Sequence, residues 1–157
     1  MIRAIFLDVD GTLISFSTHE IPASALRALA QAHERGVRLF IATGRAANDL
    51  GPLEGIPYDG VVSLNGARCV ANDGRVVSLH PIPRADFERA LALSEEQGFA
   101  MGLELEEGVF VNRVTPDVER VAHMVAHPVP EQTDLRELFG RVECCQLCFY
   151  FDAETQR

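Results

Sequence analysis

Three short polar turns of the sequence carry side chains that could bind a cation and a phosphoryl group. They read DVDGT at 8–12, TGR at 43–45 and NGA at 65–67, and an apolar run precedes each of them. The first turn supplies two carboxylates, which are the hard oxygen ligands that Mg²⁺ prefers. The other two supply a hydroxyl, a bare backbone N–H, a guanidinium fork and an amide, which suit phosphate oxygens.

Each turn alone has a plainer interpretation, which the sequence leaves open. Asp-Gly and Asn-Gly are ordinary turn signals, and the TGR turn could be a simple helix entry. A calcium loop, in contrast, needs glycine at its sixth position and glutamate at its twelfth. Counted from Asp8, these positions hold Leu13 and His19, so the calcium interpretation fails. The prediction of a phosphate site depends on the three turns acting together.

The apolar runs before the turns predict the strands that position them. We expect strands over 2–7, 37–42 and 58–64, a helix over 22–36, and a short helix from about Ala46. Strands that alternate with helices over short connections are typical of an α/β fold with a parallel sheet. In such a sheet ligands bind beyond the carboxyl ends of the strands, where the three turns would meet.

From residue 67 onward the pattern changes. An alternating hairpin is expected over 67–79, around the turn Asn72-Asp73-Gly74. Pro81 and Pro83 then punctuate the chain, and we predict two parts, residues 1–81 and 82–157. The elements expected in the second part are a helix over 84–97, strands over 100–105 and 109–113, helices over 116–126 and 134–139, and a strand over the run VECCQLCFYF at 142–151.

Composition and charge exclude several classes of protein. Of the 157 residues, 47% are hydrophobic and 24% are charged, which argues against disorder and coiled coil. No apolar run approaches the length of a membrane span, and a net charge of −9 repels nucleic acid. The four cysteines are expected to be free thiols in a reducing cytoplasm, because their spacing in the closing strand does not suit a zinc site.

The DVDGT turn after an apolar strand, followed by the TGR and NGA turns, resembles the haloacid dehalogenase (HAD) superfamily of hydrolases. More narrowly, it resembles the Cof-type phosphatases, and the resemblance covers the whole chain. It implies a Rossmann-like parallel-sheet core, of which residues 1–81 would form the first three strands. Residues 82–157 would form part of an inserted α/β cap domain.

The resemblance also implies a function, that of a Mg²⁺-dependent phosphomonoester hydrolase acting on a small phosphorylated metabolite such as a sugar phosphate. Asp8 would be the nucleophile that forms an aspartyl-phosphate. Asp10 would be the acid and base that protonates the leaving group and then activates water. Asp8 and Asp10 would also bind the Mg²⁺ ion. The other residues implied to bind phosphate or substrate are Gly11, Thr12, Thr43, Gly44, Arg45 and Asn65.

Parts of the family pattern have no counterpart in this sequence. The family uses a later lysine against the nucleophile and phosphate, but all 14 basic residues here are arginine. A later acidic turn that completes the Mg²⁺ shell is also missing. The family core has further strands beside the first, so residues 2–7 would form an open sheet edge, although their apolar run is typical of a strand buried on both faces. We therefore expect the N-terminal part of a longer phosphatase, with weak or no turnover and possible self-association through this edge.

Two alternative functions stay open at the level of the sequence. A phosphosugar mutase of the same superfamily would pass the phosphoryl group from Asp8 to a second sugar hydroxyl instead of to water. A non-catalytic module would bind phosphate, Mg²⁺ or another protein without any turnover. In none of these cases do we expect nucleic acid or a membrane as a partner.

Overall fold

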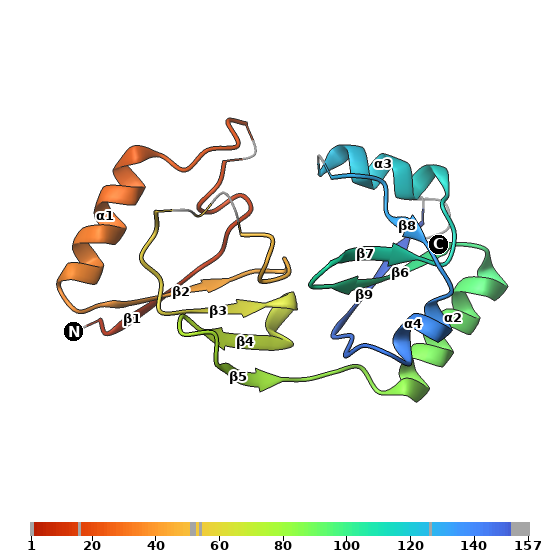
Figure 1. Cartoon of the computed structure of the whole chain (residues 1–157). Coiled ribbons are helices and arrows are strands. Elements are labelled where there is room, and N and C mark those ends of the chain that lie inside the picture. The colour runs from red at the N-terminus through yellow and green to blue at the C-terminus, as the bar shows by residue number, and fades with distance from the viewer. Residues whose placement is uncertain (1, 16, 51–52, 54, 126, 152–157) are drawn as a thin grey trace. The chain divides into compact units, whose positions relative to one another are not determined.

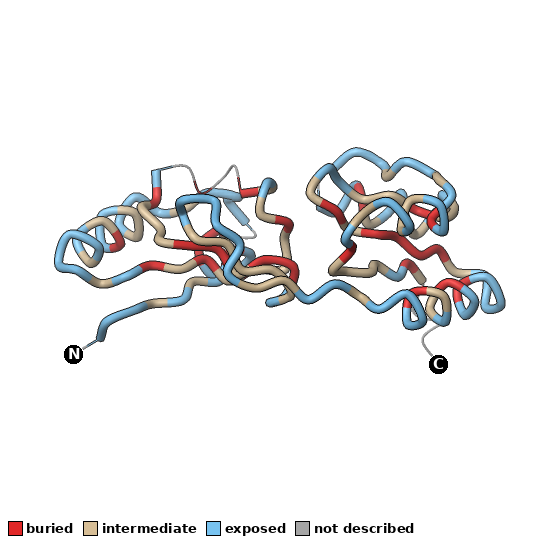
Figure 2. Tube along the Cα trace, turned by 60° about the horizontal axis from the view of Figure 1, so that its bottom comes forward, coloured by how far each residue is buried: buried red, intermediate tan, exposed pale blue. Residues whose placement is uncertain are grey.

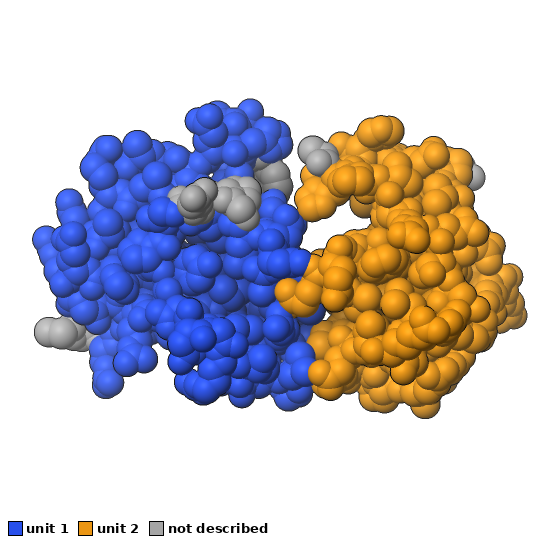
Figure 3. All heavy atoms as spheres, viewed as in Figure 1, with its two compact units in different colours: residues 1–80 blue, residues 81–157 orange. Residues whose placement is uncertain are grey.

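The chain folds into two compact units, Met1–His80 and Pro81–Arg157, which are coloured separately in Figure 3. The structure is a computed structural model, and it describes residues 2–15, 17–50, 53, 55–125 and 127–151. Each unit has its own sheet and its own hydrophobic core. The assignment of these units as parts of a catalytic core and of a cap stays a prediction.

The first unit is built on a five-stranded sheet in the order β1-β2-β3-β4-β5 (Figure 1). Its elements are β1 (Ala4–Leu7), α1 (Ala23–Glu34), β2 (Arg38–Ala42), β3 (Gly60–Ser63), the 3₁₀ turn η2 (Leu64–Gly66), β4 (Arg68–Ala71) and β5 (Val76–Leu79). β1, β2 and β3 are parallel, whereas β4 is antiparallel to both β3 and β5. The predicted α/β class, the three parallel strands and the hairpin are confirmed.

One face of this sheet packs against α1. Leu39 and Ile41 of β2 are fully buried, and they belong to the same core cluster as Leu29 of α1. The helix begins directly after Pro22, whose fixed φ suits a helix N-terminus. It ends just before Gly36, whose φ of 82° lies in the left-handed region that stops a helix. The apolar stripe and the two end signals therefore fix both the length and the orientation of α1.

β1 is less buried than its sequence predicts. It lies at the edge of the sheet beside β2, and its residues alternate between exposed and half-buried, as Figure 2 shows. Ile5 and Leu7 pack against the α1 side, whereas Phe6 is 62% exposed and stacks on Phe40 of β2 at 4.9 Å between ring centroids. The open edge is confirmed. Although the apolar run is typical of a strand buried on both faces, the face of β1 that carries Phe6 is exposed among the described residues of this unit. That further strands lie beside β1 in a longer protein stays a prediction.

Residues 46–50 form a turn instead of the predicted short helix. The backbone N–H of Asp49 donates to the carbonyl oxygen of Ala46 at 3.1 Å, which is the spacing of a tight turn. The side chains of Ala46 and Leu50 are buried on either side of it. A proline at position 52 disfavours helical backbone at the residue before it. Residues 51, 52 and 54 lie outside the described residues.

The second unit has a four-stranded sheet in the order β8-β7-β6-β9. Its elements are α2 (Arg84–Gln97), β6 (Ala100–Leu105), β7 (Gly108–Val111), α3 (Pro116–Met124), β8 (Glu131–Gln132), α4 (Leu135–Phe139) and β9 (Gln146–Tyr150). Met101 and Leu103 of β6 pack in one cluster with α2 and α4, whereas Ala100 packs with α3. Since neighbouring residues of a strand point to opposite faces, helices cover both faces of this sheet. None of the described helices is long and apolar enough to cross a membrane.

Most predicted elements of this unit are confirmed, and four differ. The strand β7 ends at Val111, two residues before the predicted end at Arg113. The helix α3 ends at Met124, while its predicted end at Ala126 lies outside the described residues. β8 was not predicted, because a strand of two polar residues shows no alternation and depends on its parallel pairing with β7. The predicted strand over 142–151 begins only at Gln146, so Cys144 and Cys145 precede it. The Cys144 thiol turns inward there and donates to the carbonyl oxygen of Gln146 at 3.2 Å.

All four cysteines are free thiols. Burial raises the pKa of the Cys144 thiol to about 11 and that of the Cys148 thiol to about 12. Both groups therefore stay protonated near neutral pH. A protonated thiol is a poor nucleophile and a poor metal ligand, so these two side chains serve as packing groups.

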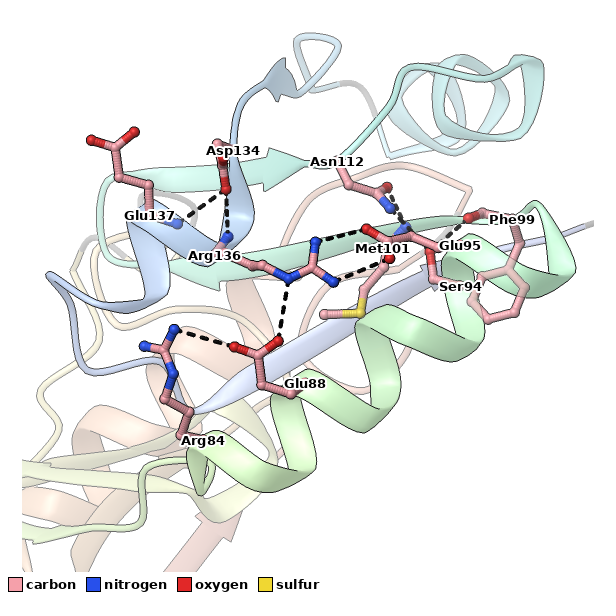
Figure 4. A network of polar contacts seen from close by, with 10 residues as sticks. All are labelled: Arg84, Glu88, Ser94, Glu95, Phe99, Met101, Asn112, Asp134, Arg136 and Glu137. Atoms are coloured by element: carbon pink, nitrogen blue, oxygen red, sulfur yellow. Dashed lines mark hydrogen bonds and ion pairs between the residues drawn. The ribbon is translucent and has the colours of Figure 1, made fainter.

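Polar side chains tie the helices of the second unit to its sheet (Figure 4). Ser94 of α2 is fully buried, and its Oγ donates to the carbonyl oxygen of Phe99 at 2.8 Å and accepts from Nδ2 of Asn112 at 3.0 Å. On the surface nearby, Arg136 of α4 donates to both carboxylate oxygens of Glu95, at 2.9 and 3.1 Å. This guanidinium lowers the pKa of Glu95. Because Arg136 and Glu95 are exposed, we expect most of the stabilisation to come from the buried contacts of Ser94.

Replacing Ser94 with alanine is expected to lower the free energy of unfolding of the second unit by about 1–3 kcal/mol, because it leaves two buried polar groups without their hydrogen bonds. The matched control is Ser24→Ala on the exposed surface of α1, which should change stability by less than about 0.5 kcal/mol. Urea denaturation followed by far-UV circular dichroism measures both changes. Equal effects of the two substitutions would show that the Ser94 contacts contribute no stability.

Candidate active site

The three predicted turns meet at the carboxyl ends of the parallel strands. β1, β2 and β3 end directly before Asp8, Thr43 and the η2 turn that contains Asn65. A pocket of about 280 Å³ lies at this edge of the sheet, and its lining residues are Asp8, Ala42, Thr43, Gly44, Val62, Asn65 and Gly66. The structure thus brings four of the predicted site residues into one pocket.

The loop after β1 exposes two carboxylates by burying the residue between them. Val9 is 1% exposed, and its carbonyl oxygen accepts from the backbone N–H of Ile14 at 2.9 Å, which closes a tight loop. Asp8 and Asp10 therefore both lie at the surface. Gly11 follows with a φ of 81°, a left-handed conformation that other residues adopt only at a cost. The glycine is thus required by the turn itself.

Thr12 orients the carboxylate of Asp8. Its hydroxyl donates to Oδ2 of Asp8 at 2.8 Å. One such bond fixes the rotation of the carboxylate and leaves its second oxygen for reaction. The resemblance implied a phosphate-binding role for Thr12, and the structure places its hydroxyl on the predicted nucleophile.

Arg45 holds Asp10 through both carboxylate oxygens. Its Nε donates to Oδ2 at 2.9 Å and its Nη2 donates to Oδ1 at 2.8 Å. Such a bidentate pair fixes both the position and the plane of a carboxylate. The resemblance implied that Arg45 faces the substrate, and the structure instead places its fork on the predicted acid and base.

This ion pair changes the ionisation of both partners. The hydrogen bonds from Arg45 lower the pKa of Asp10 below its ordinary value of 3.8, and partial burial opposes this only in part. The same contact with Asp10 raises the pKa of Arg45. At neutral pH, Asp10 is therefore ionised, which is the state of a general base.

A carboxyl whose pKa is lowered on folding stabilises the protein only while it is ionised. We expect this contribution of Asp10 to be complete above pH 3.8 and to be lost as the pH falls through its lower folded pKa. Carbon-13 NMR of the Asp10 carboxyl measures the folded pKa directly. The same resonance in Arg45→Ala is expected to titrate at a higher pH, and equal titration in both proteins would contradict the pairing.

Sequence reasoning did not identify Asp49 as part of this site. Nη1 of Arg45 donates to the backbone oxygen of Asp49 at 3.3 Å and lies 3.5 Å from its Oδ2. The two residues are four apart, a spacing that often joins opposite charges within one helical turn. The signal was therefore present in the sequence, but the predicted helix gave no reason to connect it with Asp10.

Backbone hydrogen bonds join the second turn to the third. The N–H of Arg45 donates to Oγ1 of Thr43 at 3.1 Å, and the carbonyl oxygen of Arg45 accepts from the N–H of Leu64 at 3.1 Å. The N–H of Asn65 donates to the carbonyl oxygen of Thr43 at 3.2 Å. Thr43 itself is 5% exposed. These bonds make the two loops one rigid wall of the pocket.

The third turn has an unusual backbone that aims the Asn65 side chain. Leu64 and Asn65 have φ values of 49° and 53°, in the left-handed region, and Gly66 follows at 95°. Left-handed conformations in bulky residues cost energy and are concentrated at functional sites. The Asn65 amide lies over Gly44, where an added Cβ would come within 3.2 Å of its Oδ1. Glycine at position 44 thus leaves room for the amide to reach the pocket.

The donor set of the first turn fits Mg²⁺. Mg²⁺ in proteins is usually bound by one or two carboxylates and keeps several waters. Asp8 offers a carboxylate at the pocket, and Asp10, two residues further along the same exposed loop, offers a backbone oxygen, while its carboxylate is engaged with Arg45. Among the described residues no group of three or more His, Cys, Asp or Glu side chains comes together.

The comparisons with known proteins agree with this geometry. The profile of the haloacid dehalogenase-like hydrolases matches residues 5–156. A solved structure from a study of phosphatases of the haloalkanoate (HAD) superfamily, from Bacteroides thetaiotaomicron, is 54% identical with a TM-score of 0.93, and the match covers 99% of this chain and 58% of that chain. A HAD subclass IIB sugar phosphatase is 29% identical with a TM-score of 0.83, covering 98% of this chain and 60% of that chain.

The match to a curated relative covers a smaller part of this chain. YkrA of Bacillus subtilis (strain 168), which is named as a phosphatase, is 30% identical over 95 residues, or 60% of this chain and 36% of its own. The chain therefore spans about a third of this relative and about three fifths of the solved structures above.

Proposed function

Because the chain belongs to the family of haloacid dehalogenase-like hydrolases, we propose that it is a Mg²⁺-dependent phosphomonoester hydrolase that acts through an aspartyl-phosphate. The observation that carries the proposal is the position of Asp8. Its carboxylate lines the pocket together with Thr43, Gly44 and Asn65, which offer a hydroxyl, a backbone N–H and an amide to a phosphoryl group. The bond from Thr12 fixes the carboxylate for attack.

The first half of the reaction transfers the phosphoryl group to Asp8. A carboxylate oxygen of Asp8 forms a bond to phosphorus as the bond between phosphorus and the ester oxygen breaks. The leaving oxygen takes its proton from Asp10. Asp10 must be protonated for this step, which the Arg45 contacts disfavour because they lower its pKa, so only the small protonated fraction of Asp10 can act as the acid. Thr43 and the N–H of Gly44 hold the phosphoryl oxygens, and donors that are already in place stabilise the charge on these oxygens without having to reorganise.

The second half hydrolyses the aspartyl-phosphate. Asp10 accepts a proton from water, the water oxygen bonds to phosphorus, and the bond to Asp8 breaks to release inorganic phosphate. The contacts from Arg45 keep Asp10 ionised and so able to accept a proton, although the same contacts lower its pKa and weaken it as a base.

When bound beside Asp8, Mg²⁺ would neutralise part of the negative charge that otherwise keeps a carboxylate and a phosphate apart. Asp8 would hold it through its carboxylate and Asp10 through its backbone oxygen. The 157 residues contain no lysine, so the family's later lysine has no counterpart among them. We therefore propose weak or no turnover by these residues alone.

The substrate class is proposed from a relative. The match to the HAD subclass IIB sugar phosphatase covers 98% of this chain and 60% of that protein. This similarity supports a sugar phosphate or a similar small metabolite as the substrate. The cytoplasm is the proposed compartment, because a reducing environment keeps four cysteines as free thiols.

The test is release of inorganic phosphate from a panel of sugar phosphates and an aryl phosphate. Because turnover by these residues alone is proposed to be weak, we expect at most slow release, which requires Mg²⁺ and stops on chelation with EDTA. Conversion between sugar phosphate isomers without phosphate release would favour the mutase instead. Saturable Mg²⁺-dependent binding of phosphate, with neither release nor conversion, would favour the non-catalytic module.

A further inference from the structure

We infer that Asp49 is a positioning residue, which holds the guanidinium of Arg45 so that its fork meets Asp10. The inference deepens the proposed function and rests on it, since Asp10 is the proposed acid and base. The three side-chain nitrogens of Arg45 contact two different residues. Nε and Nη2 bind Asp10, whereas Nη1 binds Asp49.

The contact with Asp49 has two components. Nη1 of Arg45 donates to the backbone oxygen of Asp49 at 3.3 Å, and the same nitrogen lies 3.5 Å from the carboxylate oxygen Oδ2. The Arg45 side chain is 24% exposed, less than the 44% of Asp10 and the 40% of Asp49. The guanidinium therefore lies between two more exposed carboxylates, one on each side.

Asp49 is itself held by the turn that replaces the predicted helix. Its N–H donates to the carbonyl oxygen of Ala46 at 3.1 Å, and the buried side chains of Ala46 and Leu50 anchor the turn to the core. The backbone of Arg45 is fixed as well, through Thr43 and Leu64. Both ends of the Arg45 side chain thus meet fixed groups.

A long arginine side chain gains from such an anchor. Ordering it costs rotamer entropy, and a second fixed contact leaves less freedom to lose when the fork meets Asp10. Asp10 must face the leaving oxygen, so its carboxylate plane has to be set before substrate binds. The plainer alternative is that Asp49 forms an ordinary surface ion pair, which contributes little.

The experiment compares Asp49→Ala with Asp49→Asn by NMR of the Arg45 Nε–Hε group in the 157-residue chain. Asp49→Ala removes the carboxylate and keeps the backbone acceptor, so it is expected to speed hydrogen exchange of this group by up to about fivefold or to broaden its signal, while backbone signals outside 43–50 stay in place. Asp49→Asn keeps an oxygen acceptor and is expected to restore most of the protection. The control is Asp117→Ala, which removes a carboxylate from an exposed arginine pair in the other unit and should leave the Arg45 signal unchanged.

Phosphate release provides the second readout. We expect Asp49→Ala to lower kcat about tenfold with KM within about twofold, because the phosphate-binding groups remain in place. An unchanged Arg45 signal in Asp49→Ala would overturn the inference, whatever the turnover. A lost Arg45 signal in a protein that shows no phosphoryl chemistry in any form would uphold the positioning of Arg45 and would instead refute the proposed function.

Discussion

Asp8→Asn is expected to abolish Mg²⁺-dependent phosphoryl transfer, with a loss of roughly 10⁴-fold or more relative to the unchanged chain. An amide is neutral and a poor nucleophile, so no covalent phosphoryl intermediate can form on it. The substitution keeps the size of the side chain and the oxygen that accepts from Thr12. We therefore expect the loop after β1 to keep its conformation, so that the loss reports on chemistry and not on folding.

This result can be measured even when turnover is slow. Beryllofluoride with Mg²⁺ mimics a phosphoryl group bound to an aspartate, and fluorine-19 NMR detects the bound form. We expect a bound signal in the unchanged chain and none in Asp8→Asn. The matched control is Asp73→Asn in the exposed hairpin turn of the same unit, which should keep the signal. A bound signal of equal intensity in Asp8→Asn would contradict the role of Asp8.

The second large effect is expected from Arg45→Ala. Losing the bidentate contact frees the Asp10 carboxylate to rotate, and misplacing a catalytic group by about 1 Å costs on the order of 10²-fold in rate. We expect kcat to fall by about that factor while the backbone bonds around residue 45 persist. Arg45→Lys is expected to recover little, because an ammonium is a point charge that does not bind a carboxylate through two parallel bonds.

The control for Arg45→Ala is Arg75→Ala, which removes an exposed arginine beside the hairpin turn of the same unit and should leave kcat within about twofold. Steady-state phosphate release at saturating substrate gives the comparison. Full activity of Arg45→Lys would show that charge alone matters and that the fork geometry does not. A rise in KM with an unchanged kcat would instead place Arg45 on the substrate, as the resemblance implied.

Much of the first unit could be predicted because its signals are local. Apolar runs predicted β2 and β3, Pro22 and Gly36 predicted the ends of α1, and Asn72-Asp73-Gly74 predicted the hairpin. The convergence of the three turns followed from the parallel order of the strands. The apolar run of β1 is typical of a strand buried on both faces, but the run does not say which segment of the chain covers each face. Among the described residues of this unit, the face that carries Phe6 is exposed.

The contacts within the site were harder to predict than its location. Asp10 and Arg45 are far apart in the sequence, and the topology says only that both lie at one edge of the sheet. The pairing of the Arg45 nitrogens with the carboxylates of Asp10 and Asp49 depends on the turn over 46–50. The sequence predicted a short helix there, so it could not predict this pairing. The dipeptide Asn65-Gly66 predicts a turn with left-handed backbone, which the structure has. The close approach of the Asn65 amide to Gly44 depends on how two loops pack together, which the dipeptide does not predict.

The central claim is that Asp8 carries the phosphoryl group, and mass spectrometry of the acid-quenched chain tests it most directly. The chain is mixed with Mg²⁺ and acetyl phosphate, quenched in acid to preserve an acyl phosphate, and digested. We predict a peptide heavier by one phosphoryl group, with the label on Asp8 and absent from Asp8→Asn. A phosphoryl group on another residue, or none on Asp8 while phosphate is released, would contradict the account.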